Sequence, residues 1–243
     1  MHLRHWFPES ESIHNMRDIG GYMAKATHIT RYGVVLRSGQ PVGASEEEIA
    51  YLLENGLTDC IDLRKESERE LYPNSLTGKV HIHTYDALPQ TSVVMATTAE
   101  EHDAAASNMG NAYIEMLDQR GAIYVQALEV IANAQGMTLV HCYAGKDRTG
   151  VLVALLLSAV GVGYLDIVAD YQVSHTYLLP SLERHMRMFP DIPPHVFSSD
   201  PVHMQRALEH LDTAYGGPLA YLQAQGMTPA LRERLCDKLL DEM

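Results

Sequence analysis

Residues 141–150 read His-Cys-Tyr-Ala-Gly-Lys-Asp-Arg-Thr-Gly, and this stretch separates two apolar segments. The segment before it, Met137 to Val140, has the length and composition of a buried strand. The segment after it, Val151 to Val160, is longer and is typical of a buried helix. The stretch therefore predicts a strand, a tight loop and a helix start, with a cysteine at one end of the loop and an arginine at the other.

Strands and helices alternate on the N-terminal side of this loop. Runs rich in apolar and β-branched residues predict strands at 34–36, 58–63 and 80–85. Helical periodicity predicts helices at 45–54, 111–117 and 122–134, and a capping box opens the first of them. A strand at 137–142 that is apolar on both faces is typical of a buried parallel sheet. We therefore expect an α/β fold with a central, mainly parallel sheet flanked by helices.

The C-terminal third carries only helical patterns, from about Gly163 onward. The predicted helices are 166–179, 201–213, 218–225 and 229–240. Because no linker rich in Pro, Gly and Ser divides the chain, we expect residues 1–243 to form a single domain, with 163–243 as its helical part. Residues 90–108, rich in Ala, Thr, Glu and Ser, fit either a weak helix or a mobile cover over the site.

The bulk composition limits the function classes. The chain has 243 residues, is 46% hydrophobic and carries a net charge of −13. Such an acidic protein is not expected to bind nucleic acid or anionic membrane surfaces. No apolar run approaches the roughly 20 residues of a membrane span, and the N-terminus lacks an apolar signal region. We expect a cytoplasmic protein, with non-classical export and the oligomeric state left open.

The loop has the chemistry of a nucleophilic phosphate site. A thiol reacts as its thiolate, and a helix N-terminus, a nearby arginine and successive backbone N–H groups all favour that charge at Cys142. The same donors can bind phosphate oxygens, two of them through the planar fork of Arg148. The predicted phosphate-binding residues are Tyr143, Ala144, Gly145, Lys146, Asp147 and Arg148.

Three neighbours are expected to support the loop. Gly150, like Gly145, permits a close approach that a Cβ would hinder. The Thr149 hydroxyl can donate to the sulfur and ease its departure, and His141 can fix the loop through a backbone hydrogen bond.

The other two cysteines, Cys60 and Cys236, are interpreted as buried small hydrophobic residues. A second hypothesis gives Cys60 a reversible disulfide with Cys142.

The decapeptide resembles the signature of cysteine-dependent protein tyrosine phosphatases, which is His-Cys, five residues, then Arg, Ser or Thr, and Gly. More narrowly, its Gly-Lys-Asp-Arg-Thr-Gly portion resembles that of a bacterial tyrosine phosphatase family related to secreted mycobacterial and Listeria enzymes. Further matching segments are Asn15–Tyr22, Leu36–Ser38, Ile61–Arg64, Tyr215–Leu222 and Gly226–Met227. The resemblance covers about residues 12–240, with 90–108 unmatched, and implies the fold of the cysteine phosphatases.

The resemblance also implies a two-step reaction without a metal or an organic cofactor. Cys142 attacks phosphorus, the leaving hydroxyl departs, and water hydrolyses the phosphocysteine. Phosphotyrosine is the expected substrate, with phosphoinositides or phosphoserine and phosphothreonine as further substrates. Lys146 favours activity on phosphoinositides, because a loop lysine also occurs in phosphatases that act on these lipids. The alternative for Lys146 is a solvated lysine that only supports the local field.

The proton donor for the leaving group is not fixed by the resemblance. The Trp-Pro-Asp loop of ordinary tyrosine phosphatases is absent, since the one tryptophan is Trp6. We rank Asp147, inside the loop, before Asp86, which follows a strand where dual-specificity phosphatases place their acid. Asp62, at another strand end, ranks third. Asp86 is alternatively a turn residue, and Asp62 alternatively an ion-pair partner of an arginine.

Two other functions are alternatives to a phosphatase. A catalytically inactive phosphate- or phosphopeptide-binding module usually lacks the cysteine or the arginine, and both are present here. A sulfurtransferase also uses a cysteine in an anion-binding loop, but the Arg-Thr-Gly ending disfavours it.

His81 and His83 share one face of a predicted strand, yet no further ligands stand at metal-binding spacing. We therefore expect no metal.

Overall fold

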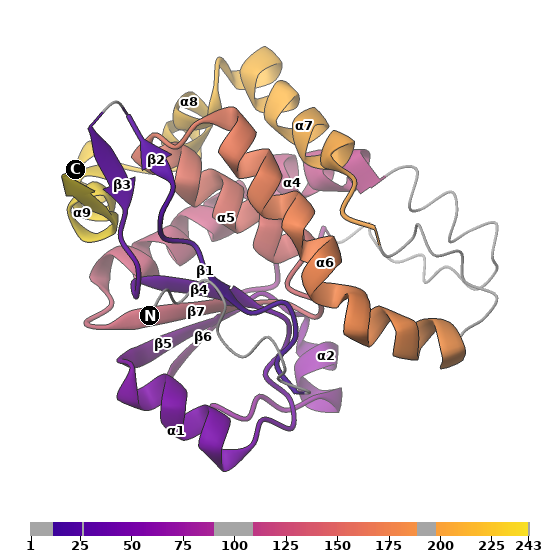
Figure 1. Ribbon diagram of the computed structural model, residues 1–243. Helices are drawn as coiled ribbons and strands as arrows, with labels where there is room; N and C mark the ends of the chain where they lie inside the picture. The colour runs from indigo at the N-terminus through magenta and orange to yellow at the C-terminus, as the bar shows by residue number, and fades with distance from the viewer. Residues whose placement is uncertain (1–11, 26, 90–108, 189–197, 243) are drawn as a thin grey trace.

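The computed structural model describes residues 12–25, 27–89, 109–188 and 198–242. Its central sheet has the strand order β1-β4-β7-β5-β6 (Figure 1). The strands are β1 (Arg17–Asp18), β4 (Val35–Ser38), β5 (Leu57–Asp62), β6 (His81–Thr84) and β7 (Met137–His141). All neighbouring pairs are parallel except β1 and β4, which are antiparallel. The expected α/β fold with a mainly parallel sheet is confirmed, whereas the expected cover at 90–108 lies outside the described residues.

The register brings the ends of three parallel strands to one edge of the sheet. Ser38 of β4 and Asp62 of β5 both pair with His141, the last residue of β7. Carboxyl ends of parallel strands are where ligand sites form in α/β sheets. The loop after β7 therefore opens at this edge, between segments that follow β4 and β5.

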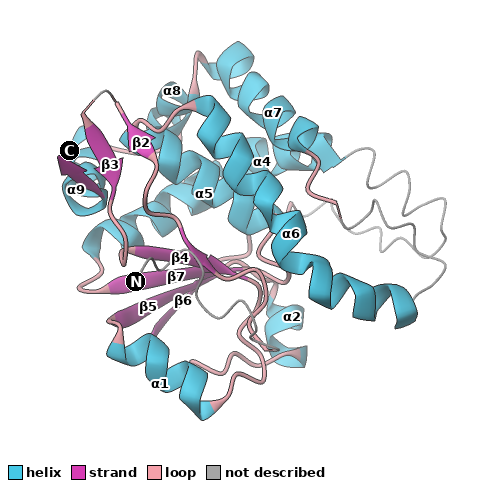
Figure 2. Cartoon of the chain, viewed as in Figure 1, coloured by secondary structure: helices cyan, strands magenta, loops and turns pink. Residues whose placement is uncertain are grey.

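Helices cover both faces of the sheet (Figure 2). On one face lies α1 (Glu46–Glu54), whose Ile49 and Leu52 join a core cluster with residues of β4, β5 and β7. The larger cluster on the other face includes α4 (Met109–Asn133) and α5 (Asp147–Val160). The remaining helices are α2 (Glu66–Leu71), α6 (Tyr164–Met188), α7 (Pro201–His210), α8 (Pro218–Ala224) and α9 (Pro229–Leu239), with a π-helix at Leu211–Tyr215.

The helix after the loop is buried on nearly every side. From Arg148 to Val160 only Ser158 is not fully buried, because the sheet lies on one side of α5 and α4, α6, α8 and α9 pack on the others. This explains why its sequence is a continuous apolar run rather than an amphipathic pattern. Gly161, with a φ of +91°, ends the helix in the left-handed conformation.

Two predictions of local structure were wrong, and one short helix was missed. The two helices expected at 111–117 and 122–134 form the single helix α4, because Gly121 is a packing site where a Cβ would collide with the side chain of Gln225. The C-terminal third is not only helical, since β8 (Leu240–Glu242) joins β2 (Met23–Ala24) and β3 (His28–Thr30) in a small sheet. The short helix α2 was not anticipated. None of the described helices is long and apolar enough to span a bilayer.

Candidate active site

The loop of residues 142–146 connects the end of β7 to the first turn of α5, as its sequence predicts. Cys142, at the start of the loop, and Arg148, in the first turn of α5, are 2% and 8% exposed. Proximity to a helix N-terminus places the sulfur where an anion is favoured electrostatically.

The carbonyl groups of the loop are bound from outside. The backbone N–H of Gln40 donates to the carbonyl of Tyr143 at 2.9 Å. The Asn15 amide donates to the carbonyls of Ala144 and Gly145, both at 3.0 Å. Because successive carbonyls face outward in a tight loop, the intervening N–H groups face inward. This is the arrangement of a backbone nest that binds anions.

A buried arginine pair anchors this arrangement to α6. Arg37 Nη2 donates to the carbonyl of Gly145 at 2.8 Å, and its Nη1 pairs with Asp170. Arg17 binds the same carboxylate through Nε at 3.1 Å and donates through Nη1 to Asn15 at 2.5 Å. The segment Asn15–Asp18 is therefore a scaffold for the loop, and not merely a turn before Gly20 and Gly21.

Gly145 is required by both conformation and space. Its φ is +69°, and a Cβ there would lie 2.1 Å from the carbonyl oxygen of Ser38. L-residues rarely adopt this φ, and no side chain fits so close to a backbone atom. Gly150 is tight but less extreme, since a Cβ would lie 3.1 Å from the ring of Tyr171.

Arg148 is oriented by a carboxylate from α2. Its Nη1 and Nη2 donate to Glu68 at 2.6 and 2.9 Å, and Nη1 also donates to the carbonyl of Leu63 at 3.4 Å. Among the described residues, Nε–H and the second Nη2–H have no protein partner. These two groups form the side-on fork that matches two oxygens of a phosphate. Burial alone would lower the pKa of Arg148, but Cys142 and Glu68 raise it, so the guanidinium stays charged.

His141 fixes the start of the loop in its neutral form. Its Nδ1 lies 3.1 Å from the carbonyl of Cys142, and its Nε2 lies 3.0 Å from the Asn74 amide nitrogen. Burial lowers the pKa of His141. Since an amide NH₂ can only donate, Nε2 accepts and Nδ1–H donates to Cys142. His141 thus has the expected backbone hydrogen bond, without a positive charge beside the sulfur.

Two further predicted residues lie at the site, Tyr143 within the loop and Thr149 in the first turn of α5. The Thr149 hydroxyl is fully buried and has no hydrogen-bond partner within the described part of the chain. It is therefore available to a group at the sulfur. Tyr143 is 40% exposed and meets Tyr72 edge to face at 5.9 Å between ring centroids.

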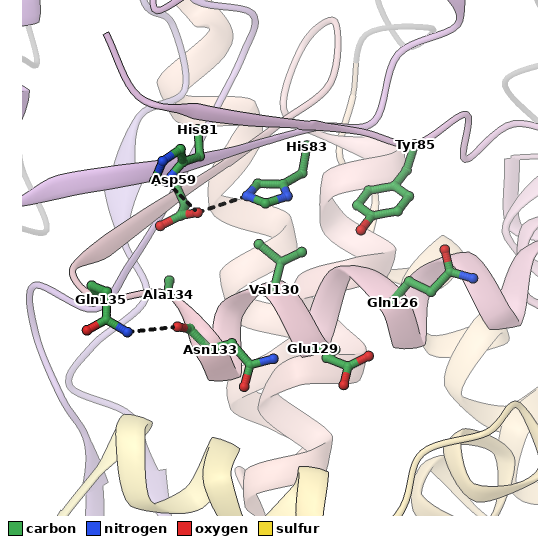
Figure 3. A pocket seen from close by; sticks show the side chains of 10 residues that line it. All are labelled: Asp59, His81, His83, Tyr85, Gln126, Glu129, Val130, Asn133, Ala134 and Gln135. Carbon is green, nitrogen blue, oxygen red and sulfur yellow. Dashed lines mark hydrogen bonds and ion pairs between the residues drawn. The ribbon is translucent and has the colours of Figure 1, made fainter.

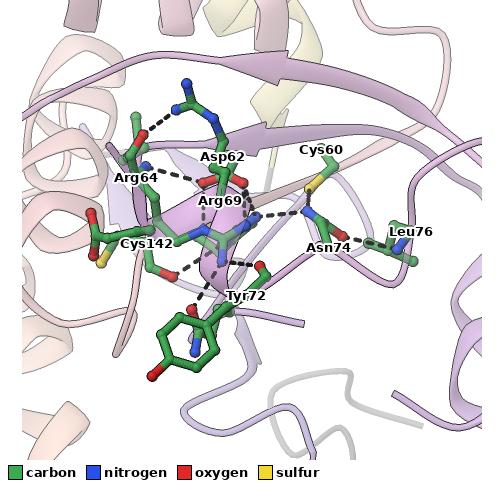
Figure 4. Close-up of polar contacts among 12 residues, drawn as sticks. Cys60, Asp62, Arg64, Arg69, Tyr72, Asn74, Leu76 and Cys142 are labelled. Atoms are coloured by element: carbon green, nitrogen blue, oxygen red, sulfur yellow. Dashed lines mark hydrogen bonds and ion pairs between the residues drawn. The ribbon is translucent and has the colours of Figure 1, made fainter. Parts of the chain in front are cut away.

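The three aspartates have very different surroundings. Asp62 is 1% exposed and is held by Arg64 through contacts of 2.9 and 2.6 Å (Figure 4). Burial would raise the pKa of Asp62, but Arg64 lowers it on balance, so this geometry favours the ion-pair interpretation. Asp86 accepts the N–H of Leu88 at 3.1 Å, which is the contact of a turn residue. Asp147 is half-buried in the loop and accepts from Tyr113 at 2.5 Å.

Lys146 is not a solvated lysine. It is 5% exposed, and its Nζ donates to the carbonyl of Ser198 at 3.0 Å. The same nitrogen lies 3.6 Å from Asp147 Oδ1. Lys146 is therefore a buried cation that is held by the Ser198 carbonyl and lies close to Asp147.

Cys60 lies apart from Cys142. The register pairs Cys60 with Leu139, three residues before Cys142, which corresponds to about 10 Å along a strand. The two cysteines also belong to core clusters on opposite faces of the sheet. A disulfide needs Cα atoms less than about 7 Å apart, so the hypothesis of a Cys60–Cys142 bridge is contradicted by the fold. All three cysteines are free thiols.

His81 and His83 line a pocket far from the loop, between β6 and α4, with a volume of about 440 Å³ (Figure 3). His83 Nε2 contacts Asp59 at 2.8 Å, and His81 lies 3.7 Å from the same oxygen. In the described ranges, no three His, Cys, Asp or Glu side chains are arranged to hold a metal ion. His83 is therefore a hydrogen-bond partner of Asp59, and His81 lies close to the same carboxylate.

Sequence reasoning missed the residues that act on the loop from a distance. Glu68 had a weak signal, since it lies in an acidic segment just after the strand end at Asp62. Asn74 had none. Tyr113 and Tyr171 lie in apolar helical patterns, in which a tyrosine looks like any other core residue.

A mainly parallel sheet, with a loop that leads from Cys142 toward Arg148 at the end of its central strand, is consistent with a phosphatase fold. The model of a tyrosine phosphatase family matches residues 8–241. The chain belongs to this family.

Curated relatives carry corresponding names. A putative tyrosine-protein phosphatase of Cupriavidus necator is 33% identical over 171 residues, which covers 68% of this chain and 62% of that protein. A tyrosine-protein phosphatase of Nostoc commune is 30% identical, covering 58% of this chain and 47% of the relative. The triple specificity protein phosphatase PtpB of Mycobacterium tuberculosis is 28% identical, covering 93% and 96%. The chain thus spans less than two thirds of the first two relatives and nearly all of the third.

Proposed function

We propose that this protein hydrolyses phosphotyrosine monoesters through a covalent phosphocysteine at Cys142. One observation carries the proposal: the loop carbonyls are bound from outside, so that its N–H groups and the fork of Arg148 converge beside a buried sulfur. Donors that bind three phosphate oxygens there also direct the phosphorus toward the thiolate.

The first step is attack of the Cys142 thiolate on phosphorus. An S–P bond forms while the P–O bond to the leaving group breaks, and Asp147 gives its proton to the departing oxygen. The Arg148 contacts strengthen as negative charge spreads over the equatorial oxygens, which accelerates the step.

In the second step, water attacks the phosphocysteine. The S–P bond breaks, the thiolate returns, and Asp147 takes a proton from the water. The hydroxyl of Thr149 donates to the departing sulfur. The products are the phenol of a tyrosine and phosphate, and no metal or organic cofactor takes part in either step.

The decisive test is hydrolysis of p-nitrophenyl phosphate and of a phosphotyrosine peptide. Cys142→Ser is expected to abolish both, whereas Cys236→Ser, a half-buried thiol on α9, serves as the matched control and retains them. If the parent protein binds phosphopeptides without turnover, it is a binding module. If it transfers sulfur from thiosulfate to cyanide, it is a sulfurtransferase.

The choice of general acid needs its own comparison. Asp147→Asn is expected to slow hydrolysis of phosphotyrosine far more than that of p-nitrophenyl phosphate, because a good leaving group needs little protonation. Asp86→Asn, at the turn after β6, should affect neither. The reverse pattern would assign the acid to Asp86.

Phosphoserine, phosphothreonine and phosphoinositides are proposed as further substrates. The buried cation of Lys146 near Asp147 supports this breadth, as does the triple specificity in the name of the mycobacterial relative. Lys146→Ala should reduce phosphoinositide hydrolysis more than phosphotyrosine hydrolysis. Equal losses, or no phosphoinositide turnover by the parent protein, would contradict a role for Lys146 in lipid specificity.

A further inference from the structure

Two buried tyrosines from different helices meet behind the loop. Tyr113 of α4 and Tyr171 of α6 are 0% and 1% exposed, and their hydroxyl oxygens lie 2.7 Å apart. Their rings pack edge to face, with centroids 5.8 Å apart. The hydroxyl of Tyr113 also lies 2.5 Å from Oδ1 of Asp147, at the start of α5. The three side chains therefore form one hydrogen-bonded chain that ends on the loop.

The direction of this chain follows from the chemistry of its members. An ionised carboxylate can only accept, so Tyr113 donates to Asp147. The Tyr113 oxygen can then accept, so Tyr171 donates to Tyr113. Burial, followed by the charge of Asp147, raises the pKa of both tyrosines. Both hydroxyls therefore remain protonated donors throughout the working pH range.

The contact distinguishes the two carboxyl oxygens of Asp147. Oδ1 accepts from Tyr113 and lies 3.6 Å from Lys146 Nζ. No protein hydrogen bond to Oδ2 occurs among the described residues. The carboxyl group is about a quarter exposed, whereas Tyr113 is fully enclosed. A proton shared with a substrate therefore belongs on Oδ2, and Oδ1 is the oxygen held by the protein.

We propose that Tyr113, supported by Tyr171, is a positioning residue for the general acid Asp147 and directs Oδ2–H at the leaving ester oxygen. The inference rests on the proposed function and extends it. As Oδ2 gives up its proton, negative charge develops on the carboxyl group, and the Tyr113 hydrogen bond strengthens. An interaction that is stronger in the transition state than in the ground state raises the rate of that step. Tyr113 keeps its own proton throughout.

A purely structural role predicts a different result. If the tyrosines only tie α4 and α6 to the loop, loss of a hydroxyl should lower the activity on every substrate alike. If Tyr113 positions the acid, the loss should depend on how much the leaving group needs a proton. A series of aryl phosphates with increasingly basic phenols separates these cases.

The central variant is Tyr113→Phe, assayed on p-nitrophenyl phosphate, phenyl phosphate and a phosphotyrosine peptide. We expect kcat/KM for the peptide to fall about 10- to 100-fold, the range for losing a hydrogen bond to a charged group. For p-nitrophenyl phosphate we expect kcat/KM to change by less than about 3-fold. The p-nitrophenolate departs without a proton, so the hydrogen bond from Tyr113 to the acid contributes little. Tyr113→Phe combined with Asp147→Asn should be no worse than Asp147→Asn alone.

Tyr221→Phe is the matched control. Tyr221 is also fully buried, and its hydroxyl donates to α4 at the carbonyl of Leu117, 2.7 Å away. Its loss removes a buried hydrogen bond to the same helix without touching Asp147, so it should show no dependence on the leaving group. Tyr171→Phe removes the donor behind Tyr113 and should show the same trend as Tyr113→Phe with a smaller slope.

The outcomes are distinct. A uniform loss on all substrates, or no loss, in Tyr113→Phe would overturn the inference. If Tyr113→Phe does not fold, the dependence of kcat/KM on the leaving group in Tyr171→Phe decides instead. If Asp147→Asn shows no leaving-group dependence while Cys142→Ser is inactive, the inference fails but the proposed function stands. If Cys142→Ser is as active as the parent protein, both fail.

Discussion

The carboxylate of Glu68 on α2 holds the guanidinium of Arg148 by two hydrogen bonds, across 80 residues of sequence. This contact leaves the Nε–H edge of Arg148 directed away from Glu68. It also neutralises a charge that is almost fully buried. The arginine is therefore already in place before a phosphate arrives, which reduces the entropy lost on binding.

Glu68→Gln is expected to lower kcat/KM for phosphotyrosine about 10- to 100-fold, because the amide keeps the shape but offers one acceptor oxygen in place of two and no charge. The loss should appear on good and poor leaving groups alike, unlike that of Tyr113→Phe. Steady-state kinetics with Glu70→Gln, an exposed residue on the same helix, gives the control. Parent-like activity in Glu68→Gln would mean that Arg148 is positioned without Glu68.

Gly145→Ala should abolish anion binding at the loop. Gly43 offers a matched control, since its φ of +70° is nearly the same but nothing lies within 4 Å of the position of its Cβ. Both substitutions impose a left-handed strain of about 1–2 kcal/mol, and only Gly145→Ala also meets the backbone of Ser38. Vanadate or phosphate titration should show binding lost in Gly145→Ala alone. Equal affinity in the two variants would contradict the close packing of the loop on β4.

Acid stability should depend on Asp170. Burial would raise the pKa of this carboxyl, but Arg17 and Arg37 lower it from 3.8 to about 2. A group whose pKa is lower in the folded state contributes stability above its unfolded pKa and loses it as the pH falls through the folded value. The contribution should thus be complete above about pH 5 and be lost between about pH 4 and 2.

Asp170→Asn tests this dependence by urea unfolding at several pH values. At pH 7 we expect the variant to be less stable by about 3–5 kcal/mol, because two buried arginines lose their shared carboxylate. The difference from the parent should shrink toward pH 3. Asp237→Asn, at an exposed position on α9, should show no such trend. A difference that stays constant with pH would mean that the carboxylate charge is not what stabilises the arginine pair.

Cys60 should be inert toward alkylation and peroxide. Burial raises the pKa of its thiol to about 12, although the Asn74 amide opposes the shift. A protonated, buried thiol does not react with iodoacetamide at neutral pH. Mass spectrometry of the native protein after brief labelling should find Cys60 unmodified, and mild peroxide should give no Cys60–Cys142 link. Rapid labelling of Cys60 would contradict its place in the core beside α1.

Local patterns predicted the parts of the site that are contiguous in sequence. The strand before Cys142, the helix after Arg148 and the need for Gly145 follow from residues within one decapeptide. Residues that reach the loop from far along the chain could not be found in this way. Glu68, Asn74, Tyr113 and Asp170 act on the loop through tertiary contacts, and little in their local sequence marks this role.

The errors in secondary structure have the same origin. Two separate helices were expected at 111–117 and 122–134, but Gly121 makes room for Gln225 in the middle of the single helix α4. The last helix was expected to run to residue 240, yet Leu240 to Glu242 pair with β3 as a strand. In both cases a packing partner that is distant in sequence overrode the local preference.

The activity should follow a bell-shaped pH profile with its maximum below neutrality. Asp147 must be protonated while the Cys142 thiol is ionised, so activity falls when either condition fails. The profile of kcat/KM for a phosphotyrosine peptide gives the measurement. Asp147→Asn should lose the decline on the alkaline side, and a flat parent profile from pH 5 to 8 would count against an aspartic acid as the proton donor.

The most direct test of the central claim is to trap the covalent intermediate. The protein is mixed rapidly with p-nitrophenyl phosphate at acidic pH, quenched, digested and analysed by mass spectrometry. We predict a phosphoryl group on the sulfur of Cys142, in the peptide that contains residues 141–148, and none in Cys142→Ser. A phosphoryl group on another residue, or turnover with no covalent adduct at any quench time, would contradict nucleophilic attack by Cys142.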